Sequence, residues 1–305
     1  MPPSQPGGPR PRVIFVNGLH RSGTTVIAEA ATEASDGVTV TAGLIAESNP
    51  YLRELLDAAA RGGPSVDRGV DARPLSEDLA EEYGWLLRDV GRVPAPNVRP
   101  QTIPTLVAII ERLAAQEGAR AVVLKNPWDF GREQALLDLD PNAYILLVRR
   151  SMSAVGASRR RALHRYGSSD AYISALTRHA PGVRMMVAAM RRRRGRALIL
   201  WLSAWGARMR VLAFLARAPA LPLDRVAFLS FEELQEDDEG ARWAAHVLDP
   251  ERFSRALRER LWNMGAPKTA RRALPDVLID RLWERVWKRL RAAQTAQMAT
   301  TAPGP

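Results

Sequence analysis

Short apolar runs rich in β-branched residues alternate along the chain with longer segments whose apolar residues recur every three to four positions. The first pattern predicts buried strands and the second predicts amphipathic helices. Strands are expected at residues 12–16, 37–41, 120–125, 143–149 and 225–231. Helices are expected at 24–35, 48–61, 76–90, 102–117, 131–137, 152–166, 251–264 and 276–293, with a more helical stretch over 170–217. This alternation is typical of an α/β fold with a central parallel sheet, here with a helix-rich carboxyl-terminal half.

The pattern contains no long linker and no internal repeat, so it predicts one α/β domain over residues 12–293. Residues 1–11 and 294–305 lack a helical or strand pattern, and we expect both to be disordered tails. Residues 63–100 are interrupted by proline and glycine. This segment is either a lid or substrate loop, or an ordinary surface excursion.

The longest apolar run, ALILWLSAWGARMRVLAFLA, covers residues 197–216 and carries Arg208 and Arg210 in its middle. A charged side chain at that depth of a bilayer is costly. The apolar positions have helical spacing: Leu198, Trp201 or Leu202, Trp205, Met209, Leu212 and Leu215. We therefore expect a buried amphipathic helix and not a membrane span. The polar, proline-rich first residues show no signal peptide, which favours a cytoplasmic location.

The amino-acid composition limits the kinds of functional site that the chain can form. The sequence has no cysteine, which excludes disulfides, thiolate zinc sites and a cysteine nucleophile, and its 46% hydrophobic content supports a packed core. The net charge of +11 attracts polyanions such as nucleic acid, anionic lipid or a multiply phosphorylated small molecule. Part of this charge lies in Arg191–Arg194, whose plainer interpretation is a solvated basic face. Few aromatic residues accompany it, so nucleic acid is not expected as a partner.

The strongest chemical signal is the stretch FVNGLHRSGTT, which lies between the first predicted strand and the first predicted helix. Gly18 and Gly23 have the separation found in a P-loop, where glycines let the backbone approach a phosphate. Backbone amides and the amino end of the following helix then favour an anion. The hydroxyl groups come from Ser22, Thr24 and Thr25. The stretch therefore predicts a phosphate-binding loop.

The loop nevertheless lacks the lysine that reaches the β- and γ-phosphates in an ATP-using P-loop. Thr24 occupies that position, and Arg21 lies earlier in the loop. A permanently charged guanidinium suits a ligand whose terminal group is transferred, with no γ-phosphate to hold and no metal.

The loop GLHRSGTT resembles the 5′-phosphosulfate-binding loop of the sulfotransferase family, whose donor is 3′-phosphoadenosine 5′-phosphosulfate. Its arginine is similar to that of the bacterial sulfotransferases and the protein-tyrosine sulfotransferases. The resemblance implies a three-layer fold like that of the P-loop NTPases and no metal. It also implies donor contacts from His20, Arg21, Ser22, Gly23, Thr24 and Thr25, with Arg21 stabilising the charge that develops during transfer.

Other segments extend the resemblance to about residue 240. The family holds the donor's 3′-phosphate with an arginine at a strand end and a serine eight residues later, a spacing that Arg150 and Ser158 share. Arg149 would place an alanine at the serine position, and the alternative for Arg150 is a solvated strand-end charge. The segment VVLKNPWDF is similar to a Lys-Asn-Pro segment in which lysine lies beside the sulfuryl group, which implies that role for Lys125. Lys268 lies in a late basic loop that either closes over the donor or is merely solvated.

Transfer to a hydroxyl or amine also needs a base. Glu47 follows the second predicted strand, where the protein-tyrosine branch carries its glutamate. Its alternative role is an acid at a helix amino terminus, where the dipole favours it. His20 is the other candidate for the base.

These observations predict a sulfotransferase acting on a small-molecule acceptor, with oligomeric state left open. One alternative is a P-loop kinase or other NTP-dependent phosphotransferase, in which Asp129 is the nearest substitute for the missing Walker B aspartate. The other is a non-catalytic protein that binds nucleotides or polyanions through its basic surface.

Overall fold

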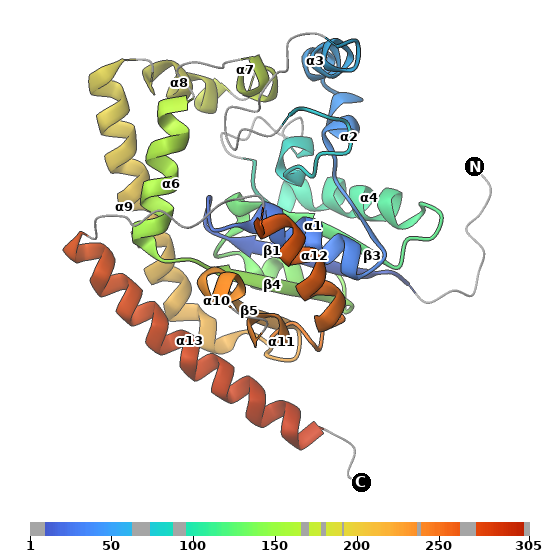
Figure 1. Ribbon diagram of the computed structural model, residues 1–305, viewed down its shortest axis with the longest axis vertical. Helices are drawn as coiled ribbons and strands as arrows, with labels where there is room; N and C mark the ends of the chain where they lie inside the picture. The colour runs from blue at the N-terminus through green and yellow to red at the C-terminus, as the bar shows by residue number, and fades with distance from the viewer. Residues whose placement is uncertain are drawn as a thin grey trace.

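At the centre of the molecule is a five-stranded sheet in the order β2-β3-β1-β4-β5, in which every neighbouring pair is parallel (Figure 1). The computed structural model describes residues 10–62, 74–87, 96–165, 171–177, 181–190, 192–236, 239–262 and 273–301. The strands are β1 (Arg12–Gly18), β2 (Gly37–Thr39), β3 (Ala121–Lys125), β4 (Ala143–Arg149) and β5 (Val226–Ser230). All five lie where the apolar runs predict them.

Helices cover both faces of the sheet, so the molecule has the three layers that the sequence predicts. One face packs against α1 (Thr24–Ala34), α10 (Phe231–Glu236), α11 (Glu239–Arg242) and α12 (Pro250–Trp262). The other packs against α4 (Ile103–Ala114), α5 (Glu133–Leu137), α9 (Arg193–Arg217) and α13 (Leu274–Thr301). In Figure 1, α6 (Met152–Arg165) and α9 stand side by side on the left. The upper part of the molecule holds α2 (Ala42–Ala46), α3 (Pro50–Ala60), α7 (Ala171–Thr177) and α8 (Pro181–Met190).

Both faces of β1, β3, β4 and β5 are largely buried, as the position of a parallel sheet between two helical layers requires, whereas the edge strand β2 is half-buried. Along β1, Val13 and Phe15 enter one core while Ile14 and Val16 enter the other. Continuous apolar runs are the sequence signature of such strands, which explains why their positions could be predicted. Four 3₁₀ turns complete the described elements: η1 (Tyr83–Leu86), η2 (Pro100–Thr102), η3 (Pro127–Asp129) and η4 (Ala218–Ala220).

The helix expected over 76–90 is wrong for its described part, which contains only η1. The chain before η1 instead runs in an extended form beside the sheet. Ala80 forms an antiparallel bridge with Thr41, and Glu82 forms a parallel bridge with Lys125. The backbone N–H of Glu81 donates to Val40 O at 2.8 Å. These long-range bonds replace the bonds of a helix.

The prediction of which face of α9 is buried is also wrong. Trp201 is 62% exposed and Trp205 is 52% exposed, and four of the other predicted core positions are exposed too: Leu198, Leu202, Met209 and Leu212. The helix packs against the sheet with a different stripe, Ala207, Val211, Phe214 and Ala218. Because both stripes are apolar and have helical spacing, the pattern alone selected the wrong one.

The last helix continues eight residues beyond its expected end at 293 and reaches Thr301. The side chain of Gln294 explains part of this extension, because it is buried and its Nε2 donates to Val226 O at 2.6 Å and Leu223 O at 2.8 Å. An amide that satisfies two backbone carbonyls next to β5 anchors the helix. Residues 294–301 are therefore helical in the structure and do not form the expected tail.

Candidate active site

The glycine-rich loop occupies the carboxyl end of β1 and leads directly into α1. Gly18 is tightly enclosed, since a Cβ atom there would lie 2.6 Å from Val148 O. Gly23 has φ 97° and Arg21 has φ 74°, a left-handed conformation that is uncommon for a residue with a side chain. Such strained positions cluster at ligand-binding sites. The loop thus holds its backbone in one unusual shape just before a helix amino terminus.

The loop directly contacts the segment after β4. Arg150 Nη1 donates to Arg21 O at 3.0 Å, and Arg21 Nε donates to Ser158 Oγ at 3.1 Å. The structure therefore joins two motifs that are 129 residues apart in the sequence. Arg149 has a different partner, since it forms an ion pair with Glu284 of α13. The spacing argument preferred Arg150 to Arg149, and Arg150 is the one of the two with this contact to the loop.

Lys125 meets the loop from β3. The side chain is buried, and its Nζ donates to Thr25 Oγ1 at 3.1 Å. Parallel strands bring their carboxyl ends to one edge of a sheet, where ligands of α/β proteins bind. Residues from the ends of β1, β3 and β4 are thus gathered around one loop, as the sequence predicts.

His20 lies in the same cluster. Its ring packs edge-on against Trp128, with 4.6 Å between centroids, and its Nδ1 lies 4.0 Å from Glu82 Oε1. Burial lowers the pKa of His20 well below its usual value, and the positive charges of Arg159, Arg210, Arg21 and Lys125 lower it further. At neutral pH the ring is therefore uncharged and accepts a proton poorly.

Three residues of this cluster were missed from the sequence: Glu82, Arg159 and Arg210. Burial lowers the pKa of Arg159 to about 10, and the charges of Arg210 and Arg21 add to the effect. Arg210 donates to three backbone carbonyls, those of Pro127, Trp128 and Phe130, at 3.1, 3.1 and 2.8 Å. Its position inside an apolar run was a signal that could have marked it. Glu82 lies within the segment where a helix was wrongly expected, 76–90, and had no such signal.

Glu47, the base expected from the sequence, contacts α4 and, among the residues that the structure describes, not the glycine-rich loop. It follows α2, is exposed, and forms an ion pair with Arg112 of α4 at 2.7 Å. Within the described residues, no contact joins it to the loop. Lys268 falls in residues 263–272, which lie outside the described residues.

The loop also contains polar atoms suited to an anionic ligand. Ser22 Oγ and His20 Nε2 are buried, and neither has a hydrogen-bond partner among the residues that the structure describes. Buried polar atoms are rarely left in this state in a folded protein. Phosphate or sulfate oxygens would accept from a serine hydroxyl and from an imidazole N–H. The loop and the surrounding cations therefore fit the phosphosulfate end of the expected donor.

Asp129, the nearest substitute for a Walker B aspartate, is committed to internal contacts. Its carboxylate accepts from Tyr83 Oη at 2.7 Å, from Val98 N at 2.6 Å and from Asn126 Nδ2 at 2.6 Å. Burial raises the pKa of Asp129. Within the described ranges, no group of three or more acidic or histidine residues is placed to hold a metal ion.

Glu133 lies beneath the loop and is buried, with Oε1 accepting from Asn17 Nδ2 at 3.0 Å and from Gly131 N at 2.7 Å. Burial raises its pKa from 4.5 to about 7. Because the folded state favours the protonated form, this residue stabilises the fold most below pH 4.5, and its contribution is lost as pH rises through 7.

We therefore expect Glu133→Gln, which is neutral at every pH, to be more stable than the wild type by about 2–3 kcal/mol at pH 8. Urea unfolding of both proteins between pH 5 and pH 8 measures this difference. At pH 5 the difference should fall below about 1 kcal/mol, which serves as the control. A difference that does not change with pH would contradict the elevated pKa.

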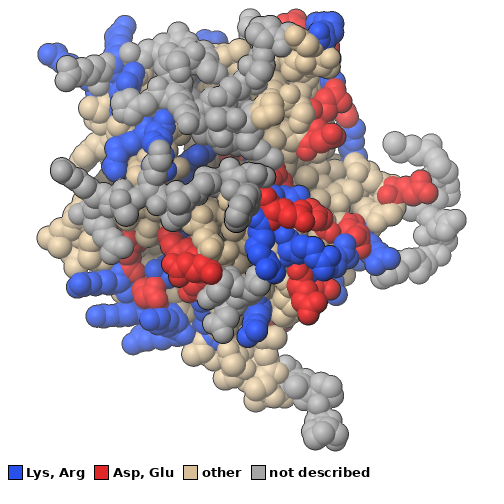
Figure 2. All heavy atoms as spheres, in the orientation of Figure 1, with Lys and Arg blue, Asp and Glu red and all other residues tan. Residues whose placement is uncertain are grey.

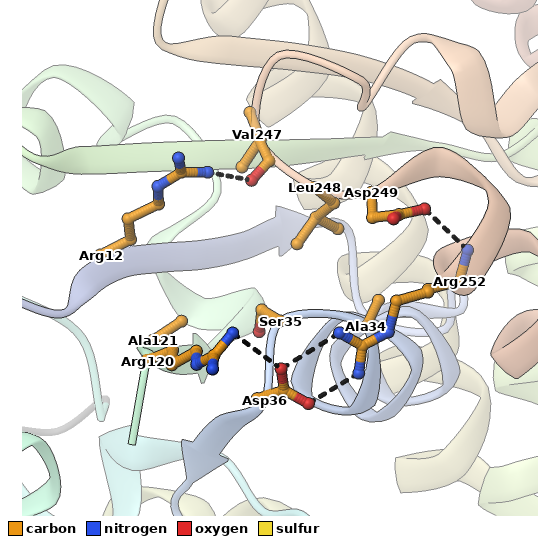
Figure 3. Close-up of a pocket in the computed structure, with 10 residues that line it drawn as sticks. All are labelled: Arg12, Ala34, Ser35, Asp36, Arg120, Ala121, Val247, Leu248, Asp249 and Arg252. Atoms are coloured by element: carbon orange, nitrogen blue, oxygen red, sulfur yellow. Dashed lines mark hydrogen bonds and ion pairs between the residues drawn. The ribbon is translucent and has the colours of Figure 1, made fainter. Parts of the chain in front are cut away.

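A hollow of about 270 Å³ lies at the opposite edge of the sheet (Figure 3). Arg12 and Ala121, which line it, begin β1 and β3, so the hollow is at the amino ends of the strands. Its charges compensate one another, since Asp36 pairs with Arg252 at 2.6 Å and with Arg120 at 3.7 Å. The hollow is therefore separate from the loop, which lies at the carboxyl ends of the strands.

A strained glycine loop at the carboxyl edge of a parallel sheet, with the buried Lys125 and partly buried arginines beside it, is an arrangement with which α/β proteins bind phosphate-like groups. The family is identified by comparison: the model of the Sulfotransferase family matches residues 11–242. The chain belongs to that family, as the resemblance in its loop predicts.

Two solved structures are similar to this chain. The sulfotransferase STF9 from Mycobacterium avium has 17% identity and a TM-score of 0.54, over 92% of this chain and 77% of that one. The sulfotransferase STF1 from Mycobacterium tuberculosis H37Rv has 17% identity and a TM-score of 0.47, over 91% of this chain and 77% of that one. At this identity, the likeness to STF9 supports the fold alone. No curated protein sequence matches the chain significantly.

Proposed function

We propose that the chain transfers the sulfuryl group of 3′-phosphoadenosine 5′-phosphosulfate to a hydroxyl or amine of a small-molecule acceptor. Membership of the Sulfotransferase family supports sulfuryl transfer in general. The observation that carries the choice of donor is the contact of Arg21 with both Arg150 and Ser158. It joins a loop suited to the phosphosulfate and a pair suited to the 3′-phosphate in one site.

The donor would be held at both ends. Backbone amides of residues 20–25 and the Ser22 hydroxyl, which is buried without a partner among the described residues, face the phosphosulfate. Arg150 and Ser158 hold the 3′-phosphate, and the late loop with Lys268 is proposed to cover the donor. When bound, the donor supplies an activated sulfuryl group and leaves as 3′,5′-bisphosphoadenosine. Arg21 and Lys125 stabilise the negative charge that grows on the bridging and sulfuryl oxygens.

Glu82 is the residue that we propose as the base. Its side chain is 18% exposed, lies 4.0 Å from His20, and belongs to a residue that bridges to Lys125. A carboxylate at this place can take the proton of an acceptor hydroxyl as that oxygen attacks sulfur. His20 is a poorer base because the surrounding cations lower its pKa. Glu47, the residue expected from the sequence, has Arg112 as its partner.

The kinase alternative is weakened by the internal contacts of Asp129 and by the missing loop lysine. Binding of polyanions without catalysis is less favoured, because Lys125 beside the loop is buried and Arg21, Arg159 and Arg210 are only partly exposed, so these cations do not form an open basic surface. A cytoplasmic location stays a prediction of the sequence, and the sequence leaves the identity of the acceptor open among a secondary metabolite, a carbohydrate, a lipid and a peptide tyrosine.

Calorimetric titration with 3′,5′-bisphosphoadenosine, without metal, tests the donor site. We expect Arg150→Ala to weaken this binding by about 10- to 100-fold, because it removes a charged donor to phosphate. Arg149→Ala is the matched control, since it removes the neighbouring arginine that pairs with Glu284, and its affinity should stay within about twofold. Tight binding of ATP with magnesium, together with no binding of the bisphosphate, would overturn the proposal in favour of a kinase.

A further inference from the structure

The outward face of α9 is an apolar stripe that the fold leaves uncovered. Six large side chains form it, all exposed to solvent: Leu198, Trp201, Leu202, Trp205, Met209 and Leu212. From Leu198 to Leu212 the stripe runs for about 21 Å along the helix at 1.5 Å per residue. Exposed apolar patches of this extent mark sites of interaction with a protein or a membrane.

A second exposed stripe lies on the neighbouring helix α13, at Leu274, Leu278 and Leu282. The two helices pack together, and Arg208 of α9 forms an ion pair with Asp276 of α13 at 2.8 Å. The beginning of the second stripe is therefore fixed beside the middle of α9. Both stripes belong to one rigid pair of helices.

The charged residues of α9 itself and of the sequence on either side of it have a single sign. Between Asp170 and Asp224 the sequence contains ten arginines and no acidic residue. Four of them, Arg191–Arg194, come just before the apolar stripe, and Arg192 and Arg194 are exposed. Figure 2 shows basic side chains gathered at the upper left, over the region where α9 begins in Figure 1. An apolar stripe next to a positive cluster is complementary to an anionic, apolar partner.

We propose that this face binds the surface of an anionic lipid bilayer, with α9 lying parallel to the membrane plane. Tryptophan is enriched where the hydrocarbon meets the headgroups, and arginine is attracted to anionic headgroups. Trp201 and Trp205 enter this boundary together with the leucines of the stripe. The exposed Arg192 and Arg194 contact lipid phosphates at one end of it. This inference concerns a surface away from the loop and does not depend on the choice of sulfuryl donor.

The same helix is long and apolar enough to be considered as a span. Residues Arg194–Ala220 have an 18-residue window of mean hydropathy 1.4 that is only 22% buried. Its inner stripe, however, packs in the core through Val211 and Phe214, and Arg210 bonds to the turn that carries Trp128. Spanning would break these contacts. A helix fixed on its inner side can only lie on the bilayer surface.

A second copy of this chain is a less suitable occupant of the face. In a symmetric dimer the stripe meets itself, and because residues 171–223 contain no acidic residue, neither arginine cluster would find an opposite charge on the partner's α9. An anionic bilayer offers the opposite charge together with apolar depth. Charge therefore favours an anionic bilayer over a second copy of this chain as the occupant of the face.

Co-sedimentation with lipid vesicles tests the proposal. The full chain should bind vesicles containing phosphatidylglycerol and should bind pure phosphatidylcholine at least tenfold more weakly. The double variant Trp201→Ser with Trp205→Ser should bind about tenfold more weakly or worse, because it removes the two largest apolar groups. Arg192→Glu with Arg194→Glu should reduce binding and its dependence on salt. Met298→Ser is the control, since it removes another exposed apolar residue, near the end of α13.

Urea unfolding of each variant separates loss of the surface from loss of the fold, because substitutions at these exposed positions should keep the unfolding midpoint close to that of the wild type. Equal sedimentation of the wild type and the tryptophan variant would overturn the proposal. So would a dimer that dissociates in the tryptophan variant while vesicles bind neither protein, and so would tight binding to RNA with no binding to anionic vesicles.

Discussion

Replacing Glu82 by Gln should lower kcat by about 10²- to 10⁴-fold while the affinity for 3′,5′-bisphosphoadenosine changes little. A glutamine cannot take the proton of an acceptor hydroxyl, yet it has nearly the same shape. It can also keep the bond in which Trp128 Nε1 donates to Oε2 of residue 82 at 3.1 Å. The loss should therefore appear in the chemical step and not in binding. Steady-state kinetics with any acceptor found in a screen, together with calorimetry, measures both quantities.

Glu47→Gln is the matched control, because it makes the same change in a residue that pairs with Arg112 and has no contact with the loop among the described residues. It should keep kcat within about threefold, as expected for an exposed ion pair. If Glu47→Gln abolishes turnover and Glu82→Gln does not, the base is the residue that the sequence suggested. Loss of bisphosphate affinity in Glu82→Gln would instead indicate a role in holding the loop.

The features that could be predicted from the sequence depend on local pattern. Four of the five strands are apolar runs because both of their faces are buried, and the loop is recognisable because its glycines, hydroxyls and arginine are adjacent in the chain. Arg150, Ser158 and Lys125 could be placed because the resemblance to the family matches them to motifs of fixed spacing at the ends of two strands.

The features that could not be predicted depend on contacts between distant segments. Glu82 reaches the site through a bridge to Lys125, and no local pattern marks that bridge. Arg159 and Arg210 come from different helices, and only the packing of α6 beside α9 places both near His20. For α9 the sequence offers two apolar stripes, and the choice between them depends on which one fits the sheet. Periodicity shows that the apolar residues of a stripe have helical spacing, but it does not show which stripe packs against the sheet.

The loop conformation itself can be tested at Gly23. A Cβ atom there would lie 2.2 Å from Phe231 Cε2, and φ is 97°. Phe231 is fully buried, and the Arg150 guanidinium lies 4.5 Å from the centre of its ring. Gly23→Ala must therefore displace either the loop or the ring beside Arg150. We expect it to weaken bisphosphate binding by more than about 100-fold and to lower the free energy of unfolding by about 2–4 kcal/mol.

Gly62→Ala separates the steric effect from the cost of a left-handed backbone. Gly62 has φ 73°, but nothing lies within 4 Å of its Cβ position, so only the backbone cost of about 1 kcal/mol is expected. Bisphosphate affinity should be unchanged in this variant, since it follows α3 and has no part in the loop. Urea unfolding and calorimetry on the two variants measure both effects. Because the clash at Gly23 acts on the loop and on Phe231 beside Arg150 at once, normal bisphosphate binding by a folded Gly23→Ala protein would place the donor outside this loop.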